Sequence, residues 1–354
     1  MNLRAPLTTE AAPGTKTLRD GMTISVVVPV RNEESSIGAL LDGLLAQTRP
    51  PDEIVLTDGG STDRTAEIIE NYMAGKTPVR LVRAAAALPG RGRNLAAAES
   101  SGEWIAFIDA GIRPARDWLE ALAERARADS RAEVVYGAWE PVTDSFFKEC
   151  AAIAYVQPPA EVEGGRIRPR FIASALMRRS VWSAVGGFPE HLRSAEDILF
   201  MDKVAAAGFR AVHAPRALVH WDIQPNLRRT FKRFLSYSRH NLRAGLWRQW
   251  QATLFKRYAL IVACSLPALL LGWKWWLAAL GALWLVMLAA RAVVSLRRNR
   301  MTYPAGAGRN FLRLLLLVPL LAAIDAAAFA GTADWVLKDK LPGGGVPAGG
   351  GDGA

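Results

Sequence analysis

The segment Trp104–Gly111 has the sequence WIAFIDAG, and its first five residues have the pattern of a strand at the centre of an α/β sheet. Apolar residues that are mostly aromatic or β-branched predict a strand buried on both faces, as in a parallel sheet. The run ends on Asp109, and ligands of open α/β sheets bind just beyond such strand ends. Asp109 is therefore a candidate functional residue. An Asp that only turns the chain, helped by Gly111, explains these residues about equally well.

Strand and helix patterns alternate on both sides of this segment. Strands are predicted over Met22–Val30, Glu53–Thr57, Val79–Val82, Val134–Gly137, Phe171–Leu176, Ala211–Ala214 and Leu218–Trp221. Helices are predicted from a cap at Ser35 or Ser36 through Leu45, around Ile68–Met73, over Arg91–Glu99 and Arg116–Ala128, and from Glu196 to near Gly208. The segment Ser145–Gly165 contains a Pro-Pro and a Gly-Gly pair and predicts a mobile loop. The alternation predicts an α/β fold, with a mainly parallel sheet covered by helices on both faces.

Composition separates the body of the chain from its C-terminal part. The 354 residues are 51% hydrophobic, with a mean hydropathy of +0.10, and the apolar excess is concentrated after Tyr258. The two cysteines, Cys150 and Cys264, lie in different kinds of segment, which favours neither a disulfide framework nor a zinc site. Residues 1–22 are polar and lack the apolar core of a signal peptide, so we expect a flexible tail there.

Positive charge gathers beside the apolar segments. The net charge is +11, yet residues 226–257 contain nine Lys and Arg and no acid, and residues 291–313 contain six Arg and no acid. The rest of the chain carries a small net negative charge. This distribution fits an anionic membrane surface better than a nucleic acid.

The C-terminal part has the pattern of membrane helices. Residues 226–257 are basic and amphipathic, which is typical of a membrane interface; a solvated helix packed on the body is the alternative. Apolar runs follow over Ala259–Trp273, Trp275–Ala290 and Phe311–Leu337. The first two are shorter than the roughly 20 residues of a straight span, but flanking basic residues and Trp side chains can extend them. We expect a hairpin of two spans and a third span; a re-entrant hairpin that never crosses is the alternative.

These patterns divide the chain into five parts. They are a tail (1–22), an α/β domain (23–225), an interfacial segment (226–257), a region of two or three transmembrane helices (258–337) and a Gly-rich tail (338–354). With the α/β domain in the cytosol, at an inner or plasma membrane, the basic loop 291–313 returns to the cytosolic side as the positive-inside rule requires.

Four motifs occur in order within the α/β domain. They are VVVPVRNE over residues 26–33, DGGSTD over 58–63, the strand ending on Asp109, and GGFP at 186–189 followed by Glu196-Asp197. As a set they resemble the family 2 glycosyltransferases, enzymes of GT-A fold that transfer a sugar from a nucleotide diphosphate. The resemblance covers residues 23 to about 221.

The resemblance implies roles for individual residues. Asp109 corresponds to the first Asp of the family's Asp-x-Asp motif, and Asp197 corresponds to its catalytic base. Apart from the resemblance, Glu196 is the neighbour of Asp197 on the predicted helix and points about 100° away around it, so we expect it to hold the acceptor or cap the helix. The implied nucleotide pocket is lined by Pro29, Arg31, Glu33 and Asp58, the last accepting a hydrogen bond from the base.

The residue types fit this chemistry. A diphosphate leaving group develops negative charge that needs a cation, and an acceptor hydroxyl needs a carboxylate to take its proton. Arg91 and Arg93, at the start of a predicted helix, are placed to meet phosphate oxygens; ordinary exposed arginines are the alternative.

One position departs from the family pattern, because Asp-Ala-Gly replaces Asp-x-Asp and Gly111 stands where the second Asp is expected. Mg²⁺ or Mn²⁺ would keep one protein carboxylate, Asp109, with phosphate oxygens and water, so we expect weak, donor-dependent metal binding. His220, at the end of a predicted strand, is a further candidate ligand, although a packed or solvated His explains it more simply.

The expected function is an inverting, membrane-anchored glycosyltransferase of the hexosyltransferase type. Its partners would be a nucleotide-sugar donor, a lipid-linked or membrane-proximal glycan acceptor on the cytosolic face, and membrane lipids, but no nucleic acid. A polyprenyl-phosphate glycosyltransferase is one alternative, although a phosphate acceptor needs little general base and Glu196-Asp197 weighs against it. The other is a non-catalytic subunit that binds nucleotide sugar for assembly or transport, to which the missing second Asp gives some weight.

Overall fold

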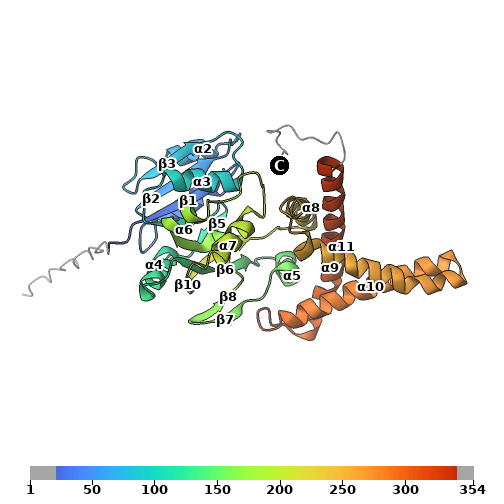
Figure 1. Cartoon of the computed structure of the whole chain (residues 1–354). Helices are drawn as coiled ribbons and strands as arrows, with labels where there is room; N and C mark the ends of the chain where they lie inside the picture. Colours follow the sequence, from blue (N-terminus) through green and yellow to red (C-terminus); the bar gives the residue numbers. More distant parts are fainter. Residues whose placement is uncertain (1–20, 341–354) are drawn as a thin grey trace, which may run out of the picture.

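The computed structural model describes residues 21–340, which form an α/β domain followed by a group of long helices (Figure 1). One sheet has the strand order β3-β2-β1-β4-β9-β6-β10-β5. Its strands are β1 (Ile24–Val30), β2 (Glu53–Asp58), β3 (Val79–Arg83), β4 (Trp104–Phe107), β5 (Ile112–Pro114), β6 (Val134–Val142), β9 (Ala175–Arg178) and β10 (Ala211–Asp222). Strands β1, β2, β3 and β4 pair in parallel, as do β6 and β10, whereas β9 and β5 are antiparallel to their neighbours.

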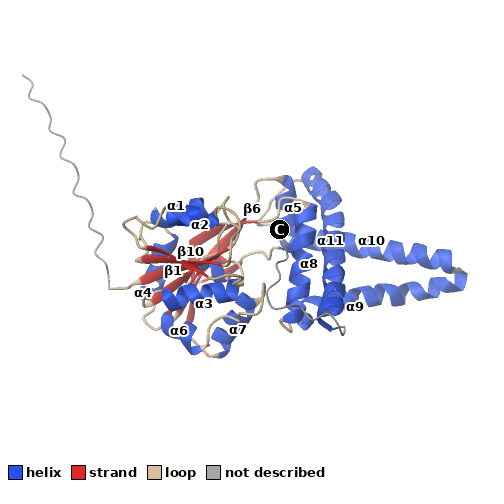
Figure 2. Cartoon of the chain, turned by 90° about the horizontal axis from the view of Figure 1, so that it is seen from above, coloured by secondary structure: helices blue, strands red, loops and turns tan. Residues whose placement is uncertain are grey.

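Helices cover both faces of this sheet (Figure 2). On one face lie α1 (Ile37–Leu45), α2 (Thr65–Glu70) and α4 (Trp118–Ala128), and on the other α3 (Pro89–Glu99), α6 (Arg179–Ala184) and α7 (Glu196–Ala206). Strand β4 lies near the middle: Ala106 belongs to the core under the first set of helices, and Phe107 to the core under the second. The predicted α/β fold, with its central buried strand, is confirmed.

Three details of the sheet differ from the predicted strands. Phe171–Leu176 is split between a 3-10 turn η1 (Ile172–Ser174) and β9, because Ser174 turns inward to accept a hydrogen bond from the indole of Trp118. The two strands predicted around Pro215 are one strand, β10, with an irregularity between Ala214 and Leu218 where proline offers no N–H. Strand β5 was not predicted, since three residues are too few for a periodic pattern.

The loop predicted over Ser145–Gly165 is wrong, because this segment contains the helix α5 (Phe146–Tyr155) and a hairpin of β7 (Ala160–Val162) and β8 (Gly165–Ile167). Helix α5 docks the α/β domain onto the C-terminal helices. Its Glu149 pairs with Arg309 and Arg313 across that interface. A buried carboxylate with distant partners has the same sequence signature as an exposed one, which explains the error.

The C-terminal helices are α8 (Leu227–Arg243), α9 (Trp247–Ser265) with the 3-10 turn η2 (Leu266–Leu271), α10 (Trp273–Arg298) and α11 (Ala307–Trp335) with the turn η3 (Val336–Lys340). Three stretches are long and apolar enough to cross a membrane: Trp247–Leu271, Trp273–Arg298 and Ala307–Lys340. Helices α9 and α10 project from the rest of the molecule as a hairpin (Figures 1 and 2), with Leu270 90% exposed at its tip. The residues predicted as one interfacial segment, 226–257, are divided between α8 and the first part of α9.

Helix α8 is fixed against α11. A side chain at Gly331 would overlap the carbonyl oxygen of Leu235, so the two backbones approach closely only because position 331 is glycine. The hydroxyl of Ser238 donates to the carbonyl of Ala328 at 2.7 Å, and Arg243 forms a bidentate pair with Asp339. The position of α8 therefore follows that of α11.

Candidate active site

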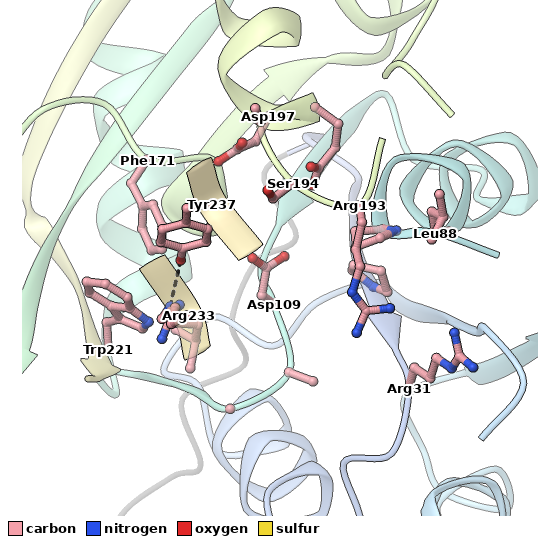
Figure 3. A pocket seen from close by; sticks show the side chains of 18 of the residues that line it. Arg31, Leu88, Asp109, Phe171, Arg193, Ser194, Asp197, Trp221, Arg233 and Tyr237 are labelled. Carbon is pink, nitrogen blue, oxygen red and sulfur yellow. Dashed lines mark hydrogen bonds between the residues drawn. The ribbon is translucent and has the colours of Figure 1, made fainter. Parts of the chain in front are cut away.

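A cavity of about 1350 Å³ begins at the carboxyl ends of β1, β2 and β4 and continues to α8. We call its two parts the strand-end half and the aromatic half. The strand-end half is lined by Pro29, Val30, Arg31, Asn32, Glu33, Thr57, Arg93, Gly111 and Arg193. The aromatic half is lined by Trp139, Tyr155, Phe171, Trp221, Arg233, Phe234 and Tyr237. Figure 3 shows Asp109 and Asp197 between the two halves.

Arg93 joins the two acidic motifs. It lies in α3, with its side chain only 4% exposed, and donates to Asp109 at 2.6 Å and to Glu196 at 2.7 Å. Burial alone would lower the pKa of this guanidinium, but the carboxylates of Asp109, Glu196 and Asp197 raise it above its ordinary value. Arg93 is thus a fixed cation that connects residues more than 80 positions apart.

The two acidic residues at the start of α7 have different surroundings. Glu196 is 5% exposed and faces Arg93, so it is Asp197 that remains beside the open part of the cavity. The expectation that Glu196 holds the acceptor does not fit this geometry, because its carboxylate is turned inward. Burial raises the pKa of Glu196 to about 7 against the opposing effect of Arg93, and burial also raises the pKa of Asp197.

The turn before α7 is strained. Ala195, the residue that caps this helix, has φ +70°, a conformation that costs a residue with a side chain roughly 1–2 kcal/mol. The packing of Phe188 against Phe200, with ring centroids 3.8 Å apart, holds both ends of this region in place. Strained backbone of this kind gathers at functional sites, and here it sets where Asp197 lies.

Two loops at the strand ends build the rest of the strand-end half. The backbone N–H of Asn32 donates to Ser61, and that of Glu33 donates to Thr65, so the RNEE and DGGSTD loops are tied together. Asp58 is buried, and its carboxylate accepts from both the N–H and the hydroxyl of Ser61. The pKa of Glu33 is raised by burial, with a further contribution from the negative charge of Asp109.

Most of the predicted site residues meet in this cavity. Pro29, Arg31, Glu33, Arg93, Asp109, Glu196 and Asp197 line it, and Asp58 lies beneath the loop at its edge. Besides Asp58, two further predicted residues do not line it. Arg91 is exposed, one helical step away from Arg93, and His220 alternates along β10 with Trp221, which lines the cavity, so it faces the other side of the strand.

Residues 25–212 match the family described as Glycosyl transferase family 2, which is more than half of the chain. The chain belongs to this family. The resemblance based on the four motifs is confirmed, and with it the enzyme class, glycosyltransferase.

Several curated members of the family are similar to this glycosyltransferase. The chain is 29% identical over 197 residues to the poly(ribitol-phosphate) beta-N-acetylglucosaminyltransferase TarS of Staphylococcus aureus, a match that covers 51% of this chain and 32% of TarS. It is 25% identical over 233 residues to the O-antigen chain rhamnosyltransferase RfbN of Salmonella typhimurium, covering 60% of this chain and 70% of RfbN. The chain thus spans about a third of the length of the first relatives that it matches.

A solved structure supports the fold assignment. The mannosyltransferase PcManGT from Pyrobaculum calidifontis, in complex with GDP-Man and Mn²⁺, superposes with a TM-score of 0.55 at 20% identity, covering 90% of this chain and 88% of that one. The GT-A-like sheet followed by three long apolar helices is therefore the architecture of this glycosyltransferase.

The space beside Gly111 is bordered by Glu33. A side chain added at Gly111 would begin 3.8 Å from a carboxylate oxygen of Glu33. Among residues 21–340, no group of three or more His, Cys, Asp or Glu side chains is arranged to hold a metal. The donor set, Asp109 and Glu33, fits a hard cation that takes its other ligands from phosphate and water.

Sequence reasoning missed the aromatic half and Arg193. Arg193 lies three residues before Glu196, and its closeness to the Glu196-Asp197 motif could have drawn attention to it. The aromatic residues come from β6, β10, α5, α8 and, with Phe171, the position just before η1, and no spacing in the sequence connects them. Trp139 and Trp221 do lie on paired strands, but that register follows only from the sheet.

Proposed function

We propose that this chain is an inverting glycosyltransferase that moves a sugar from a nucleotide-diphosphate donor to a hydroxyl of a lipid-linked or membrane-proximal glycan. The observation that carries the proposal is the position of Asp197 between the two halves of one cavity, beside the Arg93–Asp109 pair (Figure 3). A donor in the strand-end half and an acceptor in the aromatic half would meet at this carboxylate.

In this mechanism Asp197 takes the proton of the acceptor hydroxyl as its oxygen attacks the anomeric carbon. A bond forms between that oxygen and the anomeric carbon, and the bond from the anomeric carbon to the diphosphate breaks. The diphosphate leaves with the electron pair, and the proton stays on Asp197 until solvent removes it. The raised pKa of Asp197 makes it a stronger base than an exposed Asp.

The strand-end half supplies positive charge for the leaving group. Arg31 and Arg193 line the cavity and point into the same region of it (Figure 3). Arg93 fixes Asp109 so that its free oxygen stays available. A divalent cation held by Asp109 and Glu33 would neutralise charge on the diphosphate when the donor is bound.

This assignment of Asp109 predicts donor-dependent metal binding. Calorimetry with Mn²⁺ should detect little heat for the free protein and clear binding when the nucleoside diphosphate is present. Asp109→Asn should remove that binding. Tight Mn²⁺ binding by the nucleotide-free protein would contradict the assignment, since two carboxylates alone do not make a strong site.

The C-terminal helices support a membrane location. Leu266, Leu270, Leu271, Trp273 and Trp275 at the hairpin tip are exposed large apolar residues, which are unfavourable in water. Charges among the apolar helices are paired, since Asp325 accepts from Arg291 and from the hydroxyl of Tyr258. The basic residues Arg309 and Arg313 lie on the side of the α/β domain, where they bind Glu149, and this fits a domain on the cytosolic face.

The direct test is release of nucleoside diphosphate by the purified full-length protein from a panel of nucleotide sugars, with and without membrane lipid extract. The proposal expects one donor to be turned over faster when the extract is present. A donor that binds in thermal-shift measurements but releases no diphosphate with any extract would contradict the proposal and favour a nucleotide-sugar-binding subunit.

A further inference from the structure

The aromatic half of the cavity has the composition of a sugar platform. Trp139 lies 5.3 Å from Phe171 and 5.5 Å from Trp221, measured between ring centroids. The three rings come from different elements but form one cluster beside the open space. Aromatic faces carry partial negative charge and attract the polarised C–H groups on one face of a pyranose ring. A neutral apolar ligand would use the same rings, so a second feature is needed to name the ligand.

Arg233 supplies that feature. Its guanidinium lies 4.7 Å over the ring of Trp221 and 5.3 Å over that of Tyr237, and its Nε donates to the Tyr237 hydroxyl at 2.7 Å (Figure 3). Within residues 21–340, no carboxylate lies within ion-pair distance of Arg233, and its two terminal nitrogens have no hydrogen-bond partner in the protein. The side chain is half-buried, so a fixed cation with open donors faces the cavity.

Several basic residues near this cavity are bound by carboxylates; in the described part of the chain, Arg31 and Arg193, which line its strand-end half, are not among them. Arg93 is bound by two carboxylates, Lys148 by Asp144 and Asp222, and Arg168 by Glu140. Arg233 is held instead by aromatic faces, which fix its plane without neutralising its charge. Planar guanidinium groups with free terminal nitrogens bind phosphate oxygens in a bidentate manner.

We propose that the aromatic half binds an acceptor whose sugar is linked to phosphate, with the sugar on Trp139 and Trp221 and the phosphate on the terminal nitrogens of Arg233. This proposal rests on the proposed function and adds the chemical class of the acceptor. Arg233 belongs to α8, which packs on α11, and Trp250 of α9 lines the same cavity. A lipid chain attached to that phosphate would therefore leave the cavity beside the apolar helices.

The experiment compares two variants of the full-length protein in lipid nanodiscs, Arg233→Gln and Arg228→Gln. Arg228 lies on the same helix but is exposed and outside the cavity lining, so its variant is a matched control for lost charge. The acceptors are hexosyl dodecyl phosphodiesters and dodecyl hexosides that lack the phosphate. Methyl hexosyl phosphodiesters show whether a soluble phosphate is sufficient without the lipid chain.

The proposal expects Arg233→Gln to raise the KM for the phosphodiester acceptors at least tenfold, with little change for the hexosides, whereas Arg228→Gln changes neither. If Arg233→Gln raises the KM of the methyl compounds equally, and their KM values in the parent protein match those of the dodecyl compounds, Arg233 recognises the phosphate. The proposed path of the lipid chain beside the apolar helices would then be wrong. Equal losses for phosphodiesters and hexosides would overturn the proposal, because Arg233 would then only position the rings. An unchanged KM would overturn it as well.

A direct binding measurement separates failure of this inference from failure of the proposed function. Binding of the phosphodiesters is followed by calorimetry without any donor, so it does not depend on turnover. If no nucleotide sugar is turned over but the phosphodiesters bind the parent protein and not Arg233→Gln, the acceptor site stands while the enzyme assignment fails. Turnover with hexosides alone would keep the enzyme assignment and overturn the phosphate site.

Discussion

The strand-end half and the aromatic half of the cavity are held together in different ways. In the strand-end half, charged groups bind one another: Arg93 connects Asp109 and Glu196, and all three belong to the α/β domain. In the aromatic half, the guanidinium of Arg233 lies over the rings of Trp221 and Tyr237, and its helix α8 is held in place by packing on α11. The comparison teaches that the proposed donor half is built on the sheet, whereas the position of Arg233 in the proposed acceptor half depends on how the C-terminal helices dock.

The largest expected effect comes from Asp197, which serves both halves. Asp197→Asn removes the proposed base, and a positioned base contributes roughly 10²–10⁴-fold, or about 3–5 kcal/mol of barrier. We expect kcat to fall by that factor while the Kd of the donor is nearly unchanged. Asp202→Asn, on the exposed side of the same helix, is the control. Near-normal kcat in Asp197→Asn, with a verified acceptor, would show that another group takes the proton.

The next effect tests the ion pairs of the strand-end half. Arg93→Met leaves Glu196 buried without its partner, and breaking a buried pair from one side costs about 3–5 kcal/mol. Equilibrium denaturation of the detergent-solubilised protein should show a loss of that size. Arg91→Met, on the exposed side of α3, should change the stability by less than about 0.5 kcal/mol. If Arg93→Met and Arg91→Met had equal free energies of unfolding, the ion pairs of Arg93 would contribute nothing to stability.

A third variant tests whether the aromatic half depends on docking. Gly331→Leu would push α8 away from α11, and overpacking of this kind costs about 1–3 kcal/mol. We expect the KM of the acceptor to rise about tenfold, which corresponds to about 1.4 kcal/mol, with donor affinity unchanged. Gly281→Leu in α10 is the control, because a side chain there meets no neighbour within 4 Å. Equal loss of donor and acceptor affinity would contradict the division into two halves.

The smallest effect is a shift in pH dependence. Burial raises the pKa of Asp197, so its basic form is populated only above that raised value, and kcat should rise with pH on the acid side. Glu196→Gln removes one carboxylate from Arg93, whose charge then lowers the pKa of Asp197 more strongly. The acid limb of the plot of kcat against pH should therefore move to lower pH by roughly one unit. Glu99→Gln, a control at an exposed position at the end of α3, should leave the acid limb unchanged. If the acid limb of Glu196→Gln does not move, Asp197 is not the group whose titration it reports.

The family, the α/β fold and most of the strand-end half could be predicted from the sequence. Arg31 and Glu33 follow β1, Asp58 ends β2 and Asp109 comes just after β4, and parallel strands bring their carboxyl ends to one edge. Local patterns therefore determined which side chains meet there. Apolar composition likewise predicted the three apolar helices, because long runs of apolar residues with flanking basic and Trp side chains are typical of membrane helices.

Which side chains of the site contact one another could be learned only from the tertiary structure. The Arg93–Glu196 pair joins residues 103 positions apart, and nothing in the sequence indicates that these two side chains bind each other. Helix α5 was mistaken for a loop for the same reason, since Glu149 finds its partners only in α11. The aromatic half combines rings from four elements and from the residue before η1, and whether Arg233 meets a carboxylate depends on their packing. Long-range contacts of this kind leave no periodic signal, because each partner's position is set by the fold and not by its neighbours in the chain.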